Sequence, residues 1–231
     1  MFCKRTKNDI IIFKELVYNK VNTTQGGYIM DRNKVTEIKT LNKTRFLSFY
    51  EAKYENKKGN NRTWMIASRK GEEDLKEKFF NGKKDKDDAV VIAALHEPSN
   101  KLVLIKQFRI PVNDYVYEVP AGLIDEGEDA KSSVIRELKE ETGLTVTRII
   151  EKGKGNLYLS PGMTDESVRL VYCICEGGIS TESLEDDECI EPMLISKEEA
   201  KEIMYSDNNI DAKCFILLQS FSILGEKLFE D

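Results

Sequence analysis

The stretch Gly122–Leu144, which reads GLIDEGEDAKSSVIRELKEETGL, decides the interpretation of the whole 231-residue chain. It predicts a helix from about Asp129 to Thr142, because acidic residues stand in its first turn and Gly143 can adopt the left-handed conformation that ends a helix. Three apolar residues at helical spacing would pin this helix against a core: Val134, Ile135 and Leu138. The glutamates of the helix would then lie at the edge of a buried face.

Three of these glutamates occupy neighbouring positions on one side of the helix. At roughly 100° per residue, Glu137 and Glu141 lie one above the other, with Glu140 on their flank. Like charges four residues apart destabilise an isolated helix, whereas a divalent cation between them would cancel that repulsion. Converging carboxylate oxygens suit Mg²⁺, or Mn²⁺ as an alternative. Arg136 can reach back to Glu128, because its planar guanidinium matches a carboxylate better than a lysine would.

The composition excludes several classes of protein. The 41 acidic residues outnumber the 35 lysines and arginines, and the net charge of −6 argues against a nucleic-acid surface, which needs clustered basic residues. No apolar stretch approaches the roughly 18 residues of a membrane-spanning helix, and none is typical of a signal peptide. The 5 cysteines include no CxxC pair, which favours a reducing compartment. We therefore expect a soluble, cytoplasmic protein that binds neither nucleic acid nor membrane.

The single histidine, His96, precedes a turn with the sequence Glu-Pro-Ser-Asn, so we expect a surface or turn residue there rather than a catalytic base. Acid–base chemistry would then depend on carboxylates, on water bound to a metal ion, or on lysine and tyrosine. Cys173 and Cys175 share one face of an apolar run. We expect both cysteines in the core rather than as metal ligands.

Short apolar runs separated by turns predict strands on both sides of the central helix. Before the helix these runs are Arg45–Tyr54, Arg62–Ser68, Ala89–Leu95, Leu102–Gln107 and Tyr115–Val119; after it they are Thr145–Glu151, Gly155–Leu159, Ser167–Cys175 and Ile190–Ile195. Two helices close the chain: Ala200–Met204, behind a capping box that starts at Ser196, and Asp211–Leu228, with Phe215, Leu218 and Leu224 as core candidates. This order of elements predicts an α+β fold, one sheet system between helices.

Changes in polarity along the chain predict three parts. Residues 1–29 form an N-terminal extension, residues 30–87 a small β-subdomain, and residues 88–231 the main domain. The subdomain holds a hairpin with its turn at Glu55–Asn61, followed by the charged connector Gly71–Asp88, which is expected to be helical from Glu72 to Phe80. A hairpin alone is marginally stable, so this part must pack on the main domain or on a second subunit.

The spacing within the opening stretch is G-x5-E-x7-R-E-U-x-E-E-x-G-U, where U is apolar, and it resembles the Nudix box in full. A solvated acidic helix face, the simpler alternative, would not require this spacing. The flanks Lys106–Pro111, Tyr115–Glu118 and Val119–Asp125 resemble the ADP-ribose pyrophosphatase branch of the Nudix hydrolases. Pro161 follows Leu144 by 17 positions, one more than the usual spacing in that branch. The resemblance covers roughly Val35 to Leu224, and it implies a Nudix fold, a mixed β-sheet sandwiched between helices.

The same resemblance implies a role for individual residues. The metal ligands would be the Ala121 carbonyl, Glu137, Glu140 and Glu141. Catalysis would involve Glu166 as the base in the loop Thr164–Glu166, together with Glu140 and Arg136. The substrate would contact Trp64, Arg69, Arg109, Glu118 and Gly122, with the arginines on phosphate oxygens and Trp64 stacked on the base, as aromatic side chains stack on bases in nucleic-acid complexes.

The resemblance implies Mg²⁺-dependent hydrolysis of ADP-ribose, a small-molecule substrate, to AMP and ribose 5-phosphate. Two alternatives stay open: hydrolysis of another nucleoside diphosphate sugar such as GDP-mannose, and a non-catalytic domain that only senses ADP-ribose. A sensor would usually show degraded box glutamates, whereas every box acid is present here. The family commonly forms homodimers in which the N-terminal strands reach the partner's site, so a homodimer is expected, with residues 30–87 serving dimerisation and base binding.

Overall fold

The computed structural model describes residues 33–230, so the expected extension at residues 1–29 lies outside the described residues. Within that range the chain divides into two compact units, and each is described by itself. Residues 33–37 and 52–64 belong to the smaller unit, and residues 38–51 and 65–230 belong to the larger one. The predicted domain boundaries at residues 30 and 88 stay a prediction.

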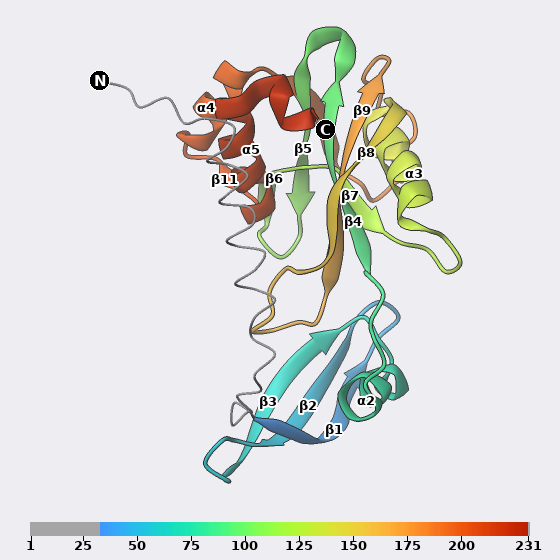
Figure 1. The fold of residues 1–231 in the computed structure, drawn as a ribbon, viewed down its shortest axis with the longest axis vertical. Helices are drawn as coiled ribbons and strands as arrows, with labels where there is room; N and C mark the ends of the chain where they lie inside the picture. Colours follow the sequence, from blue (N-terminus) through green and yellow to red (C-terminus); the bar gives the residue numbers. More distant parts are fainter. Residues whose placement is uncertain (1–32, 231) are drawn as a thin grey trace, which may run out of the picture. The chain divides into compact units, whose positions relative to one another are not determined.

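Three strands form the first sheet, in the order β1-β2-β3. They are β1 (Lys34–Lys43), β2 (Ser48–Glu55) and β3 (Asn61–Ser68), and helix α2 (Glu72–Asn81) follows them (Figure 1). The predicted hairpin is confirmed as β2 and β3, with the Asn56 side chain accepting hydrogen bonds from the backbone N–H groups of Lys58 and Asn60 in the turn. Strand β1 was not predicted, because its polar and apolar residues do not alternate regularly.

The second sheet has eight strands within the described residues, and its path runs β11-β6-β5-β4-β9-β8, with β10 paired to β5 and β7 paired to β4. The strands are β4 (Ala89–His96), β5 (Lys101–Arg109), β6 (Asp114–Glu118), β7 (Ala121–Leu123), β8 (Thr145–Tyr158), β9 (Ser167–Glu176), β10 (Ile190–Ile195) and β11 (Asn209–Ile210). The sheet is mixed, because β4 pairs parallel with β9 and antiparallel with β5.

Helices cover both faces of this sheet (Figure 1). Helix α3 (Ala130–Thr142) lies on one face, and α4 (Lys197–Met204) and α5 (Ala212–Leu224) lie on the other, where the short 3-10 helix Gly225–Phe229 closes the chain. A second 3-10 helix, Glu97–Ser99, joins β4 to β5. This arrangement confirms the predicted α+β fold with a mixed sheet between helices. No helix among residues 33–230 combines the length and the apolar character that crossing a membrane requires.

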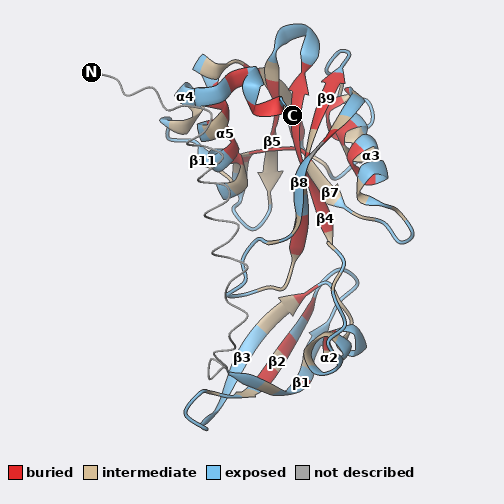
Figure 2. Cartoon of the chain, viewed as in Figure 1, coloured by how far each residue is buried: buried red, intermediate tan, exposed pale blue. Residues whose placement is uncertain are grey.

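Strand β4 separates two hydrophobic cores, and all eight of its residues are buried (Figure 2). Because side chains alternate along a strand, Val91 and Ala93 pack toward α4 and α5, whereas Val90 and Ile92 pack toward α3. Cys173 and Cys175 belong to the α3 core, as predicted, and burial raises the pKa of the Cys175 thiol to about 12. Helix α3, which carries the glutamates of the box and is called the box helix, is therefore anchored on the central strands of the sheet.

Several local predictions were wrong. Strand β8 is one continuous strand with register shifts after Ile150 and Lys154, whereas two strands were predicted on either side of this glycine-containing segment. A Cβ atom at Gly153 would lie 2.1 Å from the Leu170 carbonyl oxygen, so glycine permits the close approach of the two strands. His96 stands at the predicted turn, as the N-cap of the 3-10 helix Glu97–Ser99, but it is buried rather than at the surface, and its ring nitrogens bond the Ser99 hydroxyl and the Gly177 carbonyl.

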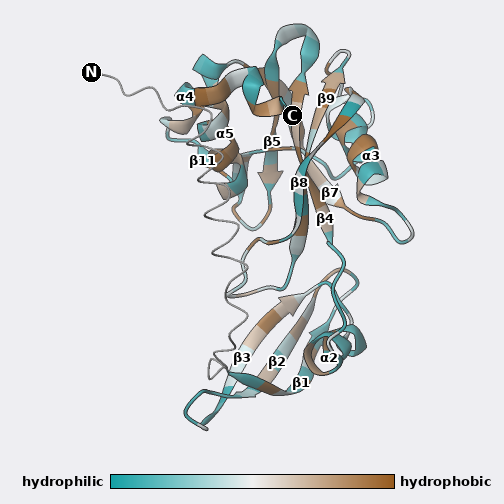
Figure 3. Cartoon of the chain, in the orientation of Figure 1, coloured by the Kyte–Doolittle hydropathy of each residue, from teal (hydrophilic) through white to brown (hydrophobic). Residues whose placement is uncertain are grey.

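Helix α5 carries apolar residues along much of its length, so its sequence does not reveal which side is buried (Figure 3). Leu218 is buried as predicted, but Phe215 and Leu224 are exposed, and the helix ends at Leu224 rather than at Leu228. Cys214 and Phe221 occupy the buried face instead. Ile135 on α3 is likewise exposed, because only Val134 and Leu138 of the predicted apolar stripe face the core.

Replacing Phe221 with alanine is expected to lower the free energy of unfolding by about 3–5 kcal/mol, because the fully buried ring would leave a cavity. Phe215→Ala, on the same helix, is the matched control, since the Phe215 side chain is 40% exposed and should cost well under half as much. Urea unfolding of the two variants measures the difference. Equal losses would show that the assignment of the buried face of α5 is wrong.

Candidate active site

The box helix begins and ends as its sequence indicates. Asp129 is the N-cap residue, and its carboxylate accepts a hydrogen bond from the Ser132 backbone N–H at 2.8 Å. Gly143 ends the helix with φ of 74°, and its N–H donates to the Lys139 carbonyl at 2.9 Å. The acidic residue therefore caps the helix rather than lying within its first turn, which contains no acidic residue. These caps fix the length of α3, and with it the positions of the glutamates.

Arg136 connects the carboxylates of the box. Its guanidinium donates to Glu128 through Nε at 3.2 Å and through Nη2 at 2.9 Å, as the sequence predicts. Its Nη1 atom donates to Glu137 Oε1 at 2.7 Å and to Glu140 Oε2 at 3.1 Å. Arg136, together with a hydrogen bond from the Ser133 hydroxyl, lowers the pKa of Glu128 to about 2. One arginine thus ties the preceding loop to the helix and holds two of the three central glutamates.

Glu137 and Glu141 carry their carboxylates into the interior of the domain. Glu141 is only 3% exposed, and its Oε2 accepts a hydrogen bond from the Ala121 N–H at 3.1 Å. Burial raises the pKa of Glu141 well above its ordinary value, and the neighbouring charge of Glu137 adds to this. Burial also raises the pKa of Glu137, although Arg136 opposes the shift. A Cβ atom at Gly122 would lie 1.9 Å from the Glu137 carboxyl group, so the β7 backbone fits directly against it.

The donor chemistry of this group fits a hard divalent cation. A buried carboxylate, Glu141, and a partly buried one, Glu137, lie one helical turn apart next to the Ala121 backbone, and they offer oxygen ligands of the kind that Mg²⁺ and Mn²⁺ prefer. Among residues 33–230, no three side chains of the metal-binding types already surround a common point. Glu137 and Glu140 instead accept hydrogen bonds from Arg136, and Glu141 accepts one from the Ala121 N–H.

The structure pairs Arg109 with Glu118 on neighbouring strands. Arg109 Nε donates to Glu118 Oε1 at 2.5 Å and Nη2 donates to Oε2 at 2.8 Å, and Glu118 is buried. In the register of β5 and β6, Arg109 lies opposite Asp114 and Glu118 lies opposite Ile105, so the long Arg109 side chain reaches back along the strand pair to Glu118. Arg109 and Val103 lie on the same face of β5, because an even number of positions separates them, and Val103 packs in the α3 core. These two predicted substrate-binding residues therefore lie on the box side of the sheet.

Arg69 and Glu166 also form a pair, although 97 residues separate them. Arg69 Nε donates to Glu166 Oε1 at 2.6 Å, and both side chains are partly exposed. The backbone brings them together, since the Ala67 N–H donates to the Met163 carbonyl at 3.0 Å and Ala67 forms a parallel bridge with Thr164. Trp64 is 53% exposed and belongs to the smaller compact unit.

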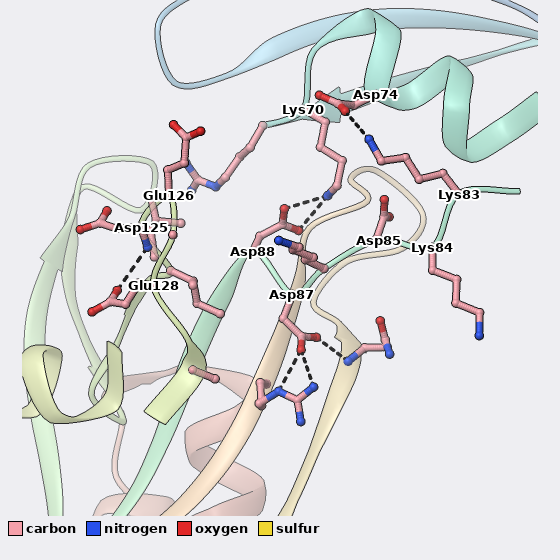
Figure 4. Close-up of a pocket in the computed structure, with 18 residues that line it drawn as sticks. Lys70, Asp74, Lys83, Lys84, Asp85, Asp87, Asp88, Asp125, Glu126 and Glu128 are labelled. Atoms are coloured by element: carbon pink, nitrogen blue, oxygen red, sulfur yellow. Dashed lines mark hydrogen bonds and ion pairs between the residues drawn. The ribbon is translucent and has the colours of Figure 1, made fainter. Parts of the chain in front are cut away.

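A charged cavity of about 790 Å³ lies beside the loop that leads into α3 (Figure 4). Residues 125–128 form one wall, and the connector residues 83–88 form another. Lys70 points toward Asp88 within this cavity, and Lys83 points toward Asp74 (Figure 4). The sequence predicts only a charged connector at Gly71–Asp88, and it does not predict these ion pairs. Only the high density of lysine and aspartate between residues 83 and 88 pointed to ion pairs.

Comparisons with known proteins agree with this geometry. A family model described as the NUDIX domain matches residues 85–216. A Caenorhabditis elegans protein named as a nudix hydrolase is 37% identical over 137 residues, and the match covers 56% of this chain and 60% of that protein's length. The ADP-ribose pyrophosphatase of Bacillus subtilis is 34% identical over 133 residues, which is 57% of this chain and 70% of the relative.

Among solved structures, an ADP compounds hydrolase superposes with a TM-score of 0.60 and 19% sequence identity, covering 82% of this chain and 94% of that chain. A likeness at this level of identity establishes the fold alone. The predicted sheet between helices therefore has a counterpart in a solved structure.

Proposed function

The chain belongs to the NUDIX family, and on that premise we propose that it is a pyrophosphohydrolase of nucleoside diphosphate sugars with ADP-ribose as its preferred substrate. One water molecule adds across the diphosphate bond, and the products are AMP and ribose 5-phosphate. The observation that carries the proposal is the complete set of box acids on α3 and in the loop before it, with the buried Glu141 and the partly buried Glu137 beside the β7 backbone. The names of the relatives support the substrate class.

Glu137, Glu141 and the Ala121 carbonyl would hold a divalent cation, Mg²⁺ or Mn²⁺, with Glu140 contributing to a further ion. When bound, the cation neutralises charge on the diphosphate and lowers the pKa of the attacking water. Arg136 keeps Glu137 and Glu140 in position, since its guanidinium contacts both carboxylates.

Glu166 accepts the proton that the attacking water loses, and Arg69 and Arg109 bind phosphate oxygens. Both arginines already contact a carboxylate, so the diphosphate competes with Glu166 for Arg69 and with Glu118 for Arg109. Competition for Arg69 frees the Glu166 carboxylate when substrate arrives. We further propose that the protein is a cytoplasmic homodimer and that residues 30–87 serve dimerisation. Trp64 would stack on the nucleobase of the substrate.

The test is turnover of a panel of nucleoside diphosphate compounds with Mg²⁺, with the products separated by chromatography. ADP-ribose is expected to give the highest kcat/KM and to yield AMP, and a chelator should abolish the reaction. A higher kcat/KM for GDP-mannose would contradict the preference for an adenine nucleotide. It would not contradict the proposed role of the α3 glutamates in hydrolysis. Binding of ADP-ribose without turnover of any compound would favour the sensor alternative.

A further inference from the structure

A cluster of partly buried ion pairs lies next to the loop that carries Glu166. We call it the lysine–aspartate cluster, and it consists of Lys70, Lys78, Asp85, Asp88 and Asp165. Lys70 Nζ lies 2.7 Å from Asp88 Oδ1 and 3.4 Å from Asp165 Oδ2. Lys78 Nζ lies 3.2 Å from the same Asp165 oxygen and also contacts Asp85. Asp165 therefore forms ion pairs with both lysines.

The cluster is largely shielded from water. The five side chains are between 10% and 20% exposed. Burial alone would lower the pKa of Lys70 and of Lys78, but the surrounding aspartates outweigh burial and raise both values. Burial would likewise raise the pKa of Asp165, yet a hydrogen bond from Ser68 and the two lysines lower it. Buried ion pairs are expensive to assemble, and breaking one by removing a single partner is strongly destabilising.

The cluster joins three separate segments of the larger unit to the Glu166 loop. Lys70 follows β3, Lys78 lies on α2, and Asp85 and Asp88 precede β4. Asp88 Oδ2 also accepts a hydrogen bond from the Ser167 N–H at 2.9 Å. The residues on both sides of Glu166 are therefore fixed, Asp165 by the lysines and Ser167 by Asp88.

Backbone hydrogen bonds also attach the Glu166 loop to the end of strand β3. The segment around Ala67 runs parallel to the segment around Thr164, with the Ala67 N–H bonded to the Met163 carbonyl. Arg69 and Glu166 follow two residues later in each segment and bond at 2.6 Å. The Glu166 N–H also donates to the Thr164 hydroxyl at 3.1 Å. This pairing therefore determines the position of the Glu166 carboxylate in the structure.

We propose that Asp165, bound between Lys70 and Lys78, is a positioning residue that sets the location of the neighbouring Glu166. Asp165 does not contact the reacting atoms, since its carboxylate is directed at the two lysines. Its effect passes through the rigid peptide bond to Glu166. A displacement of about 1 Å in a catalytic group costs on the order of 10²-fold in rate. The inference rests on the proposed function, because it assumes that Glu166 acts on the attacking water.

The experiment compares Asp165→Asn and Lys78→Met with a control on the same helix. Lys76→Met removes a lysine of α2 that forms ion pairs only within the helix among the described residues, at 2.8 Å from Glu72 and 3.0 Å from Glu73. These pairs are more exposed than those of Lys78. We expect Asp165→Asn and Lys78→Met to lower kcat by about 10- to 100-fold with KM changed less than about 3-fold. Lys78→Arg, which restores the charge, should recover most of kcat, and Lys76→Met should equal the wild type.

Hydrogen–deuterium exchange supplies a readout that does not depend on the substrate. Amides of residues 159–166 should exchange faster in Asp165→Asn and Lys78→Met, while those of β4 and β9 keep their protection. A uniform increase across all amides would show a purely structural role and overturn the proposal. An unchanged kcat, or a change confined to KM, would overturn it as well.

The two hypotheses fail in different ways. If the wild-type protein hydrolyses none of the compounds, the proposed function is wrong, and the exchange of residues 159–166 then tests the anchoring of the loop alone. Faster exchange confined to that loop would support the anchoring, and unchanged exchange would overturn it. If the wild type is active and Asp165→Asn retains full kcat, only the positioning role is wrong.

Discussion

Glu141→Gln is expected to lower kcat by at least about 10³-fold while leaving the fold intact. Glutamine has the same size as glutamate, and its carbonyl oxygen can still accept the hydrogen bond from the Ala121 N–H. It has no negative charge with which to hold a divalent cation. Steady-state turnover of ADP-ribose with Mg²⁺ measures the loss, and circular dichroism checks the fold. Turnover at the wild-type level would remove Glu141 from the set of metal ligands.

The same substitution should stabilise the protein in a buffer that contains a chelator. The pKa of Glu141 is raised in the folded state above its ordinary value of 4.5, so ionisation of this carboxyl opposes folding. Its contribution to stability is full below pH 4.5 and is lost as the pH rises through the higher folded pKa. Glutamine does not titrate. The stability advantage of Glu141→Gln should therefore grow with pH, as measured by urea unfolding, and a difference independent of pH would contradict this assignment.

Gly122→Ala is the second substitution with a large expected effect. The added Cβ would lie 1.9 Å from the Glu137 carboxyl group, and that group is the end of a flexible side chain. Glu137 can therefore swing aside, so the fold survives while the carboxylate leaves its position beside β7. We expect kcat to fall by about 10²-fold, the cost of displacing a catalytic group by roughly 1 Å. Kinetics of ADP-ribose hydrolysis with Mg²⁺ provide the measurement.

Gly178→Ala is the matched control for this effect. A Cβ atom at Gly178 meets nothing within 4 Å, and its φ does not lie in the region that favours glycine. Its turnover and its unfolding curve should both match those of the wild type. If Gly122→Ala unfolds the protein rather than slowing it, the neighbouring backbone, and not the Glu137 side chain, is what the methyl group displaces.

The box helix could be predicted from the sequence because its determinants are local. Asp129 and Gly143 act on the residues next to them, and the eight-residue separation of Glu128 and Arg136 lies within reach of one side chain. The continuous apolar run of β4 was equally clear, since a strand buried on both faces needs no alternation. The contact between Arg136 and Glu128 is accordingly the one site contact that the sequence predicted correctly.

Other features depend on distant partners and could not be predicted from one sequence. The pairs Arg69–Glu166 and Arg109–Glu118 depend on which strands and loops pair and on how far the arginine side chains reach, and propensities specify neither. The buried face of α5 was misassigned because an all-round apolar helix gives no periodic contrast. The three-residue strand β7 was missed because only its partner β4 makes it a strand.

Arg136 also has a consequence for how the protein is made in the cell. Its guanidinium contacts Glu128, Glu137 and Glu140, so the acidic helix carries a counter-charge that is part of the polypeptide. We therefore expect the repulsion among these three glutamates to be offset in a newly synthesised chain before any ion binds to it. Under the proposed function, a shortage of divalent ions is then expected to stop catalysis reversibly while the fold remains intact.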